Sequence, residues 1–577
     1  MEILYGTIDI PSIILYPVII GILIYIHTRY KFSYWRKQGV PTPRPWPLLG
    51  NFTFFLQPKL KIYEIDAKLC KQYGKRFGLY EPSANMLMIS DPEDIKAVMV
   101  KDFDKFIDRR AFGDDGGPFS KNLTNLTGEK WNAVRNVITP SFSAAKMKHM
   151  IDCVVTCSKE LTECLVETSK STKEFNAKRL FGCYTMDVIA GTAFRTNINS
   201  IKNPDHEFVK MARKVFDQGF SWKLVLMLNF PKLAAKLGVT FIDDGVANYF
   251  ANLVRKIINL RKYEEKSPDF LSLLKESMEE GAFDDSKPKK PKKPKIETSN
   301  EDWKKESKKC TYNPWKRVLL MIANQKKPKK PKIETSNEDW KKESKKCTYI
   351  AYSVSDGHSS RILYIFSLVM TEDLVIAQCV LFFLAGYDTT ASTLSMVAYN
   401  IAIHPECQDK LIKEIDIATE KHGTLTYDAI GEMPYLKAVL KETLRLYGPA
   451  TRLERKCTQN YQLGNIFLEK GTLVAIPTYS LHHDAEYWPE PEKFDPERFM
   501  GDPNDINPYT YLPFGIGRRN CVAMRFAEME VKVAIASMLS KVRLFKSPKT
   551  SVPPKFSNGG GMQPIDMVIG VETRIVA

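Results

Sequence analysis

The chain has 577 residues, of which 44% are hydrophobic and 26% charged, so it is long and apolar enough to bury a sizeable core. Its formal net charge is +17, but residues 287–349 alone hold 21 lysines and arginines against 8 acids, which leaves the remainder nearly balanced. The high pI therefore describes one segment and excludes a nucleic-acid-binding surface spread over the molecule, and eleven scattered cysteines without a C-x-x-C pair exclude a disulfide-built scaffold.

The first 30 residues predict a membrane anchor. Residues 10–28 contain no lysine, arginine or acid, and a helix of that length spans about 30 Å, the thickness of the hydrocarbon layer. Four basic residues follow, which by the positive-inside rule places the rest of the chain in the cytosol: Arg29, Lys31, Arg36 and Lys37. A cleaved signal peptide is the alternative, but the basic flank lies on the wrong side for one.

Residues 31–50 predict a hinge between this anchor and a catalytic domain over residues 51–577. The segment is basic at first and then carries a proline at every second position from Pro41 to Pro47. Closely spaced prolines favour a stiff, extended chain. Beyond the hinge, helical periods dominate, and strand-like pieces are short, as at 87–89, 460–463 and 472–477. We therefore expect a mainly α fold with a small β portion.

Trp131 and Arg135 place two hydrogen-bond donors together on one predicted helix. They are four residues apart, so an indole N–H and a guanidinium lie one helical turn from each other. Such a pair can hold an anionic group.

A lysine- and proline-rich insert is predicted over residues 287–370. Within it, residues 289–312 recur without a change at 326–349, an offset of 37. Structural repeats drift in sequence, so this identity indicates a recent duplication or an error of gene assembly. The lysine–proline alternation favours neither helix nor strand. We expect a disordered or artefactual loop, with a membrane-surface or partner contact as the alternative.

The segment Ala385-Gly-Tyr-Asp-Thr-Thr390 follows an apolar run whose hydrophobic residues cover every helical face, which predicts a fully buried helix. Acidic residues at both ends leave the uncharged run too short to span a membrane. Glycine in a helix interior costs about 1 kcal/mol relative to alanine. Gly386 therefore suggests that another group lies close to the helix backbone there. A threonine hydroxyl can bond the carbonyl one turn back, which predicts a local kink beside Asp388 and Thr389. A satisfied Thr–Asp pair in an ordinary core helix is the alternative.

Two charged motifs follow. Glu442 and Arg445, at i and i+3, share one face of a helix. The segment Pro496-Glu-Arg-Phe499 comes about fifty residues later and supplies Arg498. Exposed pairs of this kind contribute little to stability.

The most informative segment, Pro513-Phe-Gly-Ile-Gly-Arg-Arg-Asn-Cys521, ends in a cysteine directly before a helical run. An arginine, Arg519, lies two residues before the cysteine. A thiol there faces the positive end of the helix dipole and nearby unpaired backbone N–H groups, and both favour the thiolate. Gly515 and Gly517 allow the backbone to pass close to a flat group. A buried, inert cysteine is the alternative.

Four motifs in this order resemble the cytochrome P-450 family: W-x-x-x-R, A-G-x-D-T-T, E-x-x-R and F-x-x-G-x-R-x-C. The resemblance covers roughly residues 35–285 and 371–577 and is to the animal microsomal branch that oxidises drugs, steroids and other lipophiles. Ala523 departs from it, because the family usually has glycine there. The implied fold is the cytochrome P-450 fold with an N-terminal transmembrane helix.

The resemblance also implies the site. Cys521 would be the thiolate ligand of haem b (iron protoporphyrin IX), Thr389 would take part in oxygen activation, and Asp388 would feed protons inward. The propionates would be held by Trp131, Arg135, Arg109 and Arg452. Phe514, Gly517 and Arg519 would complete the cofactor loop, while Glu442, Arg445 and Arg498 would form a structural triad behind it. The substrate pocket would draw on residues 106–126, 208–228, 382–390, 450–453 and 559–563.

The implied activity is insertion of one oxygen atom from O2 into small lipophilic substrates such as xenobiotics, steroids or fatty acids. The implied partners are an NADPH-dependent flavoprotein reductase, docking on Lys130, Arg518 and Arg525, and a small haem electron carrier. The enzyme would lie in the endoplasmic reticulum membrane with its catalytic domain on the cytosolic face. Two alternatives remain: a haem-thiolate isomerase or peroxide-rearranging enzyme, and an inactive haem-binding protein.

Overall fold

The computed structural model describes residues 12–51, 61–110, 120–203, 205–216, 223, 226–227, 230–240, 242–260, 270–271, 274, 348–356, 359–367, 371–558 and 561–574. The chain divides into two units, Met1–Glu276 with Met370–Ala577, and Ser277–Val369. In the second unit the described residues form one antiparallel hairpin, β4 (Thr348–Asp356) with β5 (Ser359–Ser367). The rest of the predicted insert, including nearly all of both duplicated copies, lies outside the described residues.

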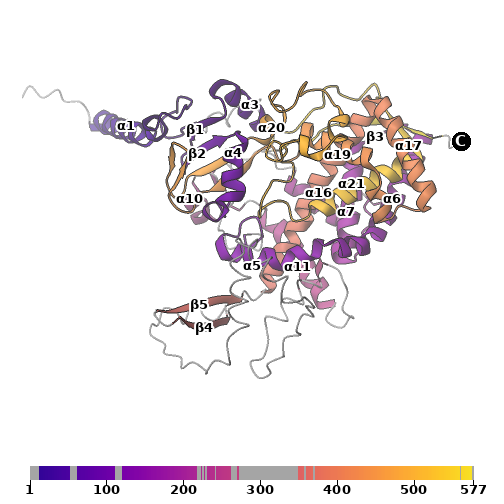
Figure 1. Ribbon diagram of the computed structural model, residues 1–577, viewed down its shortest axis with the longest axis horizontal. Coiled ribbons are helices and arrows are strands. Elements are labelled where there is room, and N and C mark those ends of the chain that lie inside the picture. Colours follow the sequence, from indigo (N-terminus) through magenta and orange to yellow (C-terminus); the bar gives the residue numbers. More distant parts are fainter. Residues whose placement is uncertain are drawn as a thin grey trace, which may run out of the picture. The chain divides into compact units, whose positions relative to one another are not determined.

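Helices dominate the first unit, as predicted (Figure 1). Their bounds are α1 (Ser12–Lys31), α2 (Tyr34–Lys37), α3 (Ile62–Tyr73), α4 (Pro92–Lys96), α5 (Gly128–Ile138), α6 (Ala144–Lys170), α7 (Ala177–Phe194), α8 (Glu207–Phe216), α10 (Pro231–Lys236), α11 (Asp244–Leu260), α16 (Glu372–Ile403), α17 (Pro405–His422), α18 (Tyr427–Gly431), α19 (Pro434–Tyr447), α20 (Thr478–His482) and α21 (Met524–Leu539).

The β portion is small, and the short strands expected near residues 87, 461 and 473 are present. The largest sheet has four strands in the order β1-β2-β9-β6, in which β2 and β9 run parallel and the other neighbours antiparallel. These strands are β1 (Arg76–Tyr80), β2 (Asn85–Ile89), β9 (Leu473–Ile476) and β6 (Leu453–Lys456). A three-stranded sheet joins β10 (Val542–Phe545), β11 (Val568–Thr573) and β3 (Glu174–Asn176), and β7 (Tyr461–Leu463) pairs with β8 (Ile466–Leu468).

The core is built around α16. Thr371 caps this helix by accepting from the N–H of Leu374 at 3.3 Å, and Pro405 opens the next helix after it ends. The helix α16 is long and apolar enough to cross a membrane, yet 72% of its most apolar window is buried inside the protein. It packs along α7 and α21, and α21 packs on α6. The prediction of a buried core helix is therefore confirmed.

At the N-terminus, the predicted anchor segment is helical in α1, and most of its described side chains are exposed, including Tyr16, Ile20 and Leu23. Isoleucines and leucines around this helix give it an apolar surface, most of which has no partner among the described residues.

Candidate functional site

A cavity of about 450 Å³ lies where α5, α7, α16 and the start of α21 meet. Seven of the predicted site residues line it: Arg109, Trp131, Arg135, Thr389, Phe514, Arg519 and Cys521. Segments from positions 109 to 521 therefore converge on one space. Asp388 and Arg452 are not among the lining residues.

The loop before α21 gives Cys521 its position. The Cys521 N–H donates to the carbonyl oxygen of Phe514 at 2.9 Å, which closes the loop on itself. Gly515 and Gly517 have φ values of 70° and 75°, in the left-handed region that favours glycine. A Cβ at Gly517 would collide with the carbonyl oxygen of Met99, so the glycine also allows close packing of two backbones. Ala523 has a φ of −94°, a conformation for which no glycine is needed.

The Cys521 side chain is exposed to the cavity although protein atoms surround it closely. Burial raises the pKa of its thiol, while the Ala523 N–H and the charges of Arg135 and Arg109 act in the opposite direction. The N–H group at the helix end thus favours the thiolate, as expected, although burial outweighs it in this protein. A bound metal deprotonates a coordinating thiol.

Three guanidinium groups gather beside this cysteine, and a fourth lies near two of them. Arg109 donates to the carbonyl oxygen of Arg519 at 2.8 Å, and Arg135 donates to the carbonyl and side-chain oxygens of Asn520, both at 2.9 Å. The Arg519 guanidinium lies 4.5 Å from the centre of the Trp131 ring. The fourth group is Arg455, a residue that the sequence did not single out; it is 1% exposed.

These cations repel each other. Burial and Arg109 lower the pKa of Arg519 to about 9, and burial with the charges of Arg109 and Arg519 lowers the pKa of Arg455 well below its ordinary value. The Nε atoms of Arg455 and Arg519 have no hydrogen-bond partner among the described residues. Buried cations of this kind call for an anionic group. A dianionic, flat cofactor with a soft ligand on one face fits this cavity, so these residues fit haem.

Arg452 has a different partner. It forms a bidentate ion pair with Asp66, whose carboxylate is fully buried, and its Nε donates to Asp66 Oδ2 at 2.8 Å. Arg455 lies three residues on, in β6, and its Nη1 donates to the carbonyl oxygen of Glu454 at 2.9 Å. The geometry thus brings Arg455 and not Arg452 to the cationic cluster. Sequence alone could not choose between them, because the choice depends on Asp66, far away in α3.

On α16, Thr389 faces the cavity and Asp388 does not. The Thr389 hydroxyl donates to the carbonyl oxygen of Ala385 at 2.7 Å, the predicted bond one turn back, although α16 continues without a break. A Cβ on Gly386 would lie 2.7 Å from the Ile189 side chain of α7, which accounts for the glycine. The Asp388 carboxylate is buried and bonded to Lys178 and Gln563.

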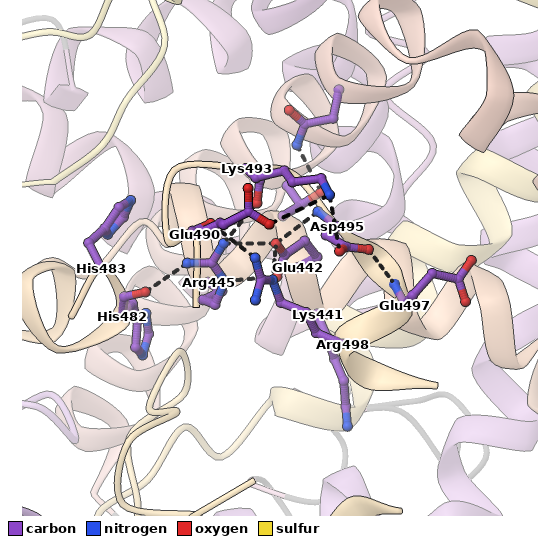
Figure 2. A network of polar contacts seen from close by, with 12 residues as sticks. Lys441, Glu442, Arg445, His482, His483, Glu490, Lys493, Asp495, Glu497 and Arg498 are labelled. Carbon is purple, nitrogen blue, oxygen red and sulfur yellow. Dashed lines mark hydrogen bonds and ion pairs between the residues drawn. The ribbon is translucent and has the colours of Figure 1, made fainter. Parts of the chain in front are cut away.

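Figure 2 shows the charged network around Glu442. Both carboxylate oxygens of Glu442 accept from Arg445 at 2.8 Å, and the Arg498 Nε lies 3.5 Å from Glu442 Oε1. Arg445 also donates to the carbonyl oxygens of His482 at 2.8 Å and Lys493 at 3.2 Å. The three predicted residues are brought together, with the Glu442 and Arg445 side chains fully buried.

The apolar part of the cavity wall comes partly from predicted segments. Leu123, Phe382, Ala450 and Leu453 belong to them. Segment 208–228 contributes no lining residue among its described positions. Other lining residues were not predictable from the sequence, because each sits on a helix whose apolar face is typical of an ordinary core: Phe142, Met150, Ile189, Thr192, Ala193, Phe270 and Phe526.

Comparison with known proteins agrees with this site. The family model described as "Cytochrome P450" matches residues 40–306 and 308–569. Cytochrome P450 3A5 of Homo sapiens is 32% identical over 96% of this chain and 95% of its own length. Cytochrome P450 3A29 of Sus scrofa is 32% identical, covering 95% and 94%, and cytochrome P450 3A9 of Rattus norvegicus is 33% identical, covering 94% and 93%.

Proposed function

The chain belongs to the cytochrome P450 family and is a haem-thiolate monooxygenase, and we propose that it oxidises small lipophilic substrates with electrons that an NADPH-dependent flavoprotein reductase delivers. The observation that carries this proposal is the convergence of Cys521, Thr389 and three guanidinium groups, those of Arg109, Arg135 and Arg519, on one largely apolar cavity. Xenobiotics, steroids and fatty acids are the substrate classes that such a wall accommodates.

Cys521 would hold the haem iron through its thiolate. Arg109, Trp131, Arg135, Arg455 and Arg519 would hold its propionates, since propionate charge relieves the mutual repulsion of the guanidinium groups. When bound, the haem supplies the activation of dioxygen and the transfer of one oxygen atom to the substrate.

The chain's own residues would orient the substrate and control protons. Phe142, Ile189 and Phe382 would exclude water and press a lipophilic molecule against the reacting centre. Thr389, whose hydroxyl lies at the cavity wall, would hold a proton near the oxygen that reacts, and Asp388, the preceding residue, would supply it.

The exposed apolar helix α1 and exposed basic side chains support a proposal for the location and the partners of the enzyme. We propose that α1 crosses the membrane of the endoplasmic reticulum, with residues 31–50 as the hinge and the catalytic domain on the cytosolic face. Lys130, Arg518 and Arg525 are exposed and would form the docking site for the reductase, or for a small haem electron carrier. Residues 287–370 would be an insert that the reaction does not use.

A spectrum tests the assignment. Reduced holoenzyme treated with carbon monoxide should show the strongly red-shifted Soret band of a thiolate-ligated haem, and Cys521→Ala should lose it. Cys457→Ala is the matched control, because Cys457 is a buried cysteine of the β6–β9 region that does not line the cavity. A red-shifted band that persists in Cys521→Ala would contradict the ligand assignment.

A further inference from the structure

Two cysteines of α6 form a pair outside the haem cavity. Cys153 and Cys157 are four residues apart, so their side chains share one face of the helix. Both are free and half-buried, and their thiols are hydrogen-bonded to each other. Cys164 is on the same face but about 10 Å further along the helix axis, too far to join the pair. Neither Cys153 nor Cys157 lines the haem cavity.

The spacing of the pair does not allow a disulfide. Side chains four apart on a helix have their Cβ atoms about 5–6 Å apart, whereas a disulfide requires about 3.5–4.5 Å. The helix α6 is continuous from Ala144 to Lys170, so it does not unwind at the pair. A single atom bonded to both sulfurs spans a longer distance, because each such bond is about 2.3 Å long. The pair is therefore suited to chelation and not to oxidation.

The neighbouring helix holds the first thiol in place. A Cβ at Gly191 of α7 would lie 2.4 Å from Cys153 Sγ, so the glycine allows the α7 backbone to pack directly against the sulfur. Cys153 is thereby supported on the side of α7, while its hydrogen bond directs the sulfur toward Cys157. A ligand that needs two sulfur atoms on one side finds them already arranged, which lowers the entropy lost on binding.

The groups around the pair favour an electrophilic ligand. The S–H of Cys157 donates to Cys153 and lowers the pKa of that thiol, whereas the pKa of Cys157 is raised. Other titratable groups that interact with the pair are acids and a phenol: Asp187, Glu160, Glu530 and Tyr184. Glu530 of α21 is fully buried, and neither of its carboxyl oxygens has a hydrogen-bond partner among the described residues. The surroundings thus offer the sulfurs an electron-rich environment.

The number of ligands restricts what can bind. Among the described residues, no group of three or more histidines, cysteines and acids could hold a metal ion, so a tetrahedral zinc site is not available here. Thiolates select soft centres. A soft centre that already carries one substituent needs only two sulfur ligands, and trivalent arsenic with one organic group is such a centre.

We infer that Cys153 and Cys157 form a binding site for monosubstituted trivalent arsenicals. With phenylarsine oxide, two As–S bonds form and the arsenic–oxygen bond breaks. The oxygen leaves as water and takes the two thiol protons, so no oxidant or reductant is needed. The inference does not depend on the monooxygenase reaction, because the site lies outside the haem cavity.

The test titrates full-length holoenzyme with phenylarsine oxide and follows the bound arsenical by native mass spectrometry. The parent for this test carries Cys310→Ser and Cys347→Ser, which remove the cysteines of the duplicated segment. It should bind one equivalent, which the dithiol dimercaprol releases. Cys153→Ser and Cys157→Ser should each weaken binding about 100-fold or more, because a second tethered group raises affinity by roughly 10²–10⁴. Cys164→Ser is the matched control and should bind as tightly as the parent.

A further variant keeps the number of thiols and changes their spacing. Cys157→Ser/Val155→Cys places the two thiols two residues apart, where side chains do not face each other. It should bind phenylarsine oxide as weakly as Cys157→Ser alone. Binding as tight as that of the parent, in this variant or in either single variant, would overturn the inference.

Alkylation of the parent protein gives an answer even where a variant fails to fold. After saturation with phenylarsine oxide, iodoacetamide labelling read by peptide mass spectrometry should show Cys153 and Cys157 protected together. Cys164 should be labelled to the same extent as without the arsenical. Protection of one cysteine of the pair without the other, or of neither, would contradict a site that uses both sulfurs.

Discussion

At the scale of single residues, burial and not sequence position decides what each arginine does. Arg452 and Arg455 flank the same dipeptide, yet one neutralises the buried Asp66 and the other lies near two further cations, Arg109 and Arg519. The first side chain compensates a buried charge within the protein itself. The second side chain is unfavourable in the protein alone and becomes favourable only with an anionic cofactor.

This difference predicts opposite effects for two leucine substitutions. Arg455→Leu should not lower the free energy of unfolding of the haem-free protein, because it removes a cation that its neighbours repel. The same substitution should weaken haem binding about tenfold or more, as expected when a charged hydrogen bond of about 1.5–3 kcal/mol is lost. Arg452→Leu should lower the unfolding free energy by about 3–5 kcal/mol, because Asp66 remains buried without its partner. Denaturant unfolding and haem transfer to apomyoglobin measure the two quantities. Equal haem retention in both variants would contradict the assignment.

At the scale of elements, a buried ion pair and its hydrogen bonds hold the segment that leads into the cysteine loop. The Glu442–Arg445 pair of α19 binds the carbonyl oxygens of His482, at the end of α20, and of Lys493, while Asp495 donates its N–H to Glu442 Oε1 at 3.0 Å. His482 Nε2 in turn accepts the N–H of Leu512, one residue before the loop begins, at 2.8 Å. One buried pair thus connects α19 with α20 and, through His482, with the segment leading to Cys521.

Removing one member of this network should be costly. We expect Glu442→Ala to lower the unfolding free energy by about 3–5 kcal/mol, because Arg445 stays fully buried without a carboxylate. Lys410→Ala is the matched control: Lys410 pairs with Glu497 at 2.6 Å, but both side chains are more than half exposed, so the loss should stay below about 1 kcal/mol. Urea unfolding followed by circular dichroism gives both values. Similar losses of unfolding free energy in the two variants would show that the buried pair contributes no more to stability than the exposed pair.

At the scale of the whole molecule, the sequence predicted much of the fold and the site, for identifiable reasons. The mainly helical architecture and the core helix α16 were readable because a 3.6-residue period and an uninterrupted apolar run are local properties. The direction of Asp388, the choice of Arg455 and the dominance of burial over the helix dipole at Cys521 were not, because each depends on residues from distant segments. Lys178 is separated from Asp388 by 210 positions, and no local pattern reports that contact.

The unit formed by residues 277–369 supplies none of the described residues that line the cavity. Excision of residues 289–325, one full period of the duplication, should therefore leave the carbon-monoxide spectrum and the thermal unfolding midpoint of the holoenzyme unchanged. The excised segment carries 11 lysines and arginines against 4 acids, so its removal should lower retention on a cation exchanger and binding to anionic vesicles. The control exchanges the same eleven basic residues for glutamine without shortening the chain, which separates charge from length. Loss of the haem spectrum in the shortened chain alone would show that the insert's length supports the catalytic unit; loss in both would show that its charge does.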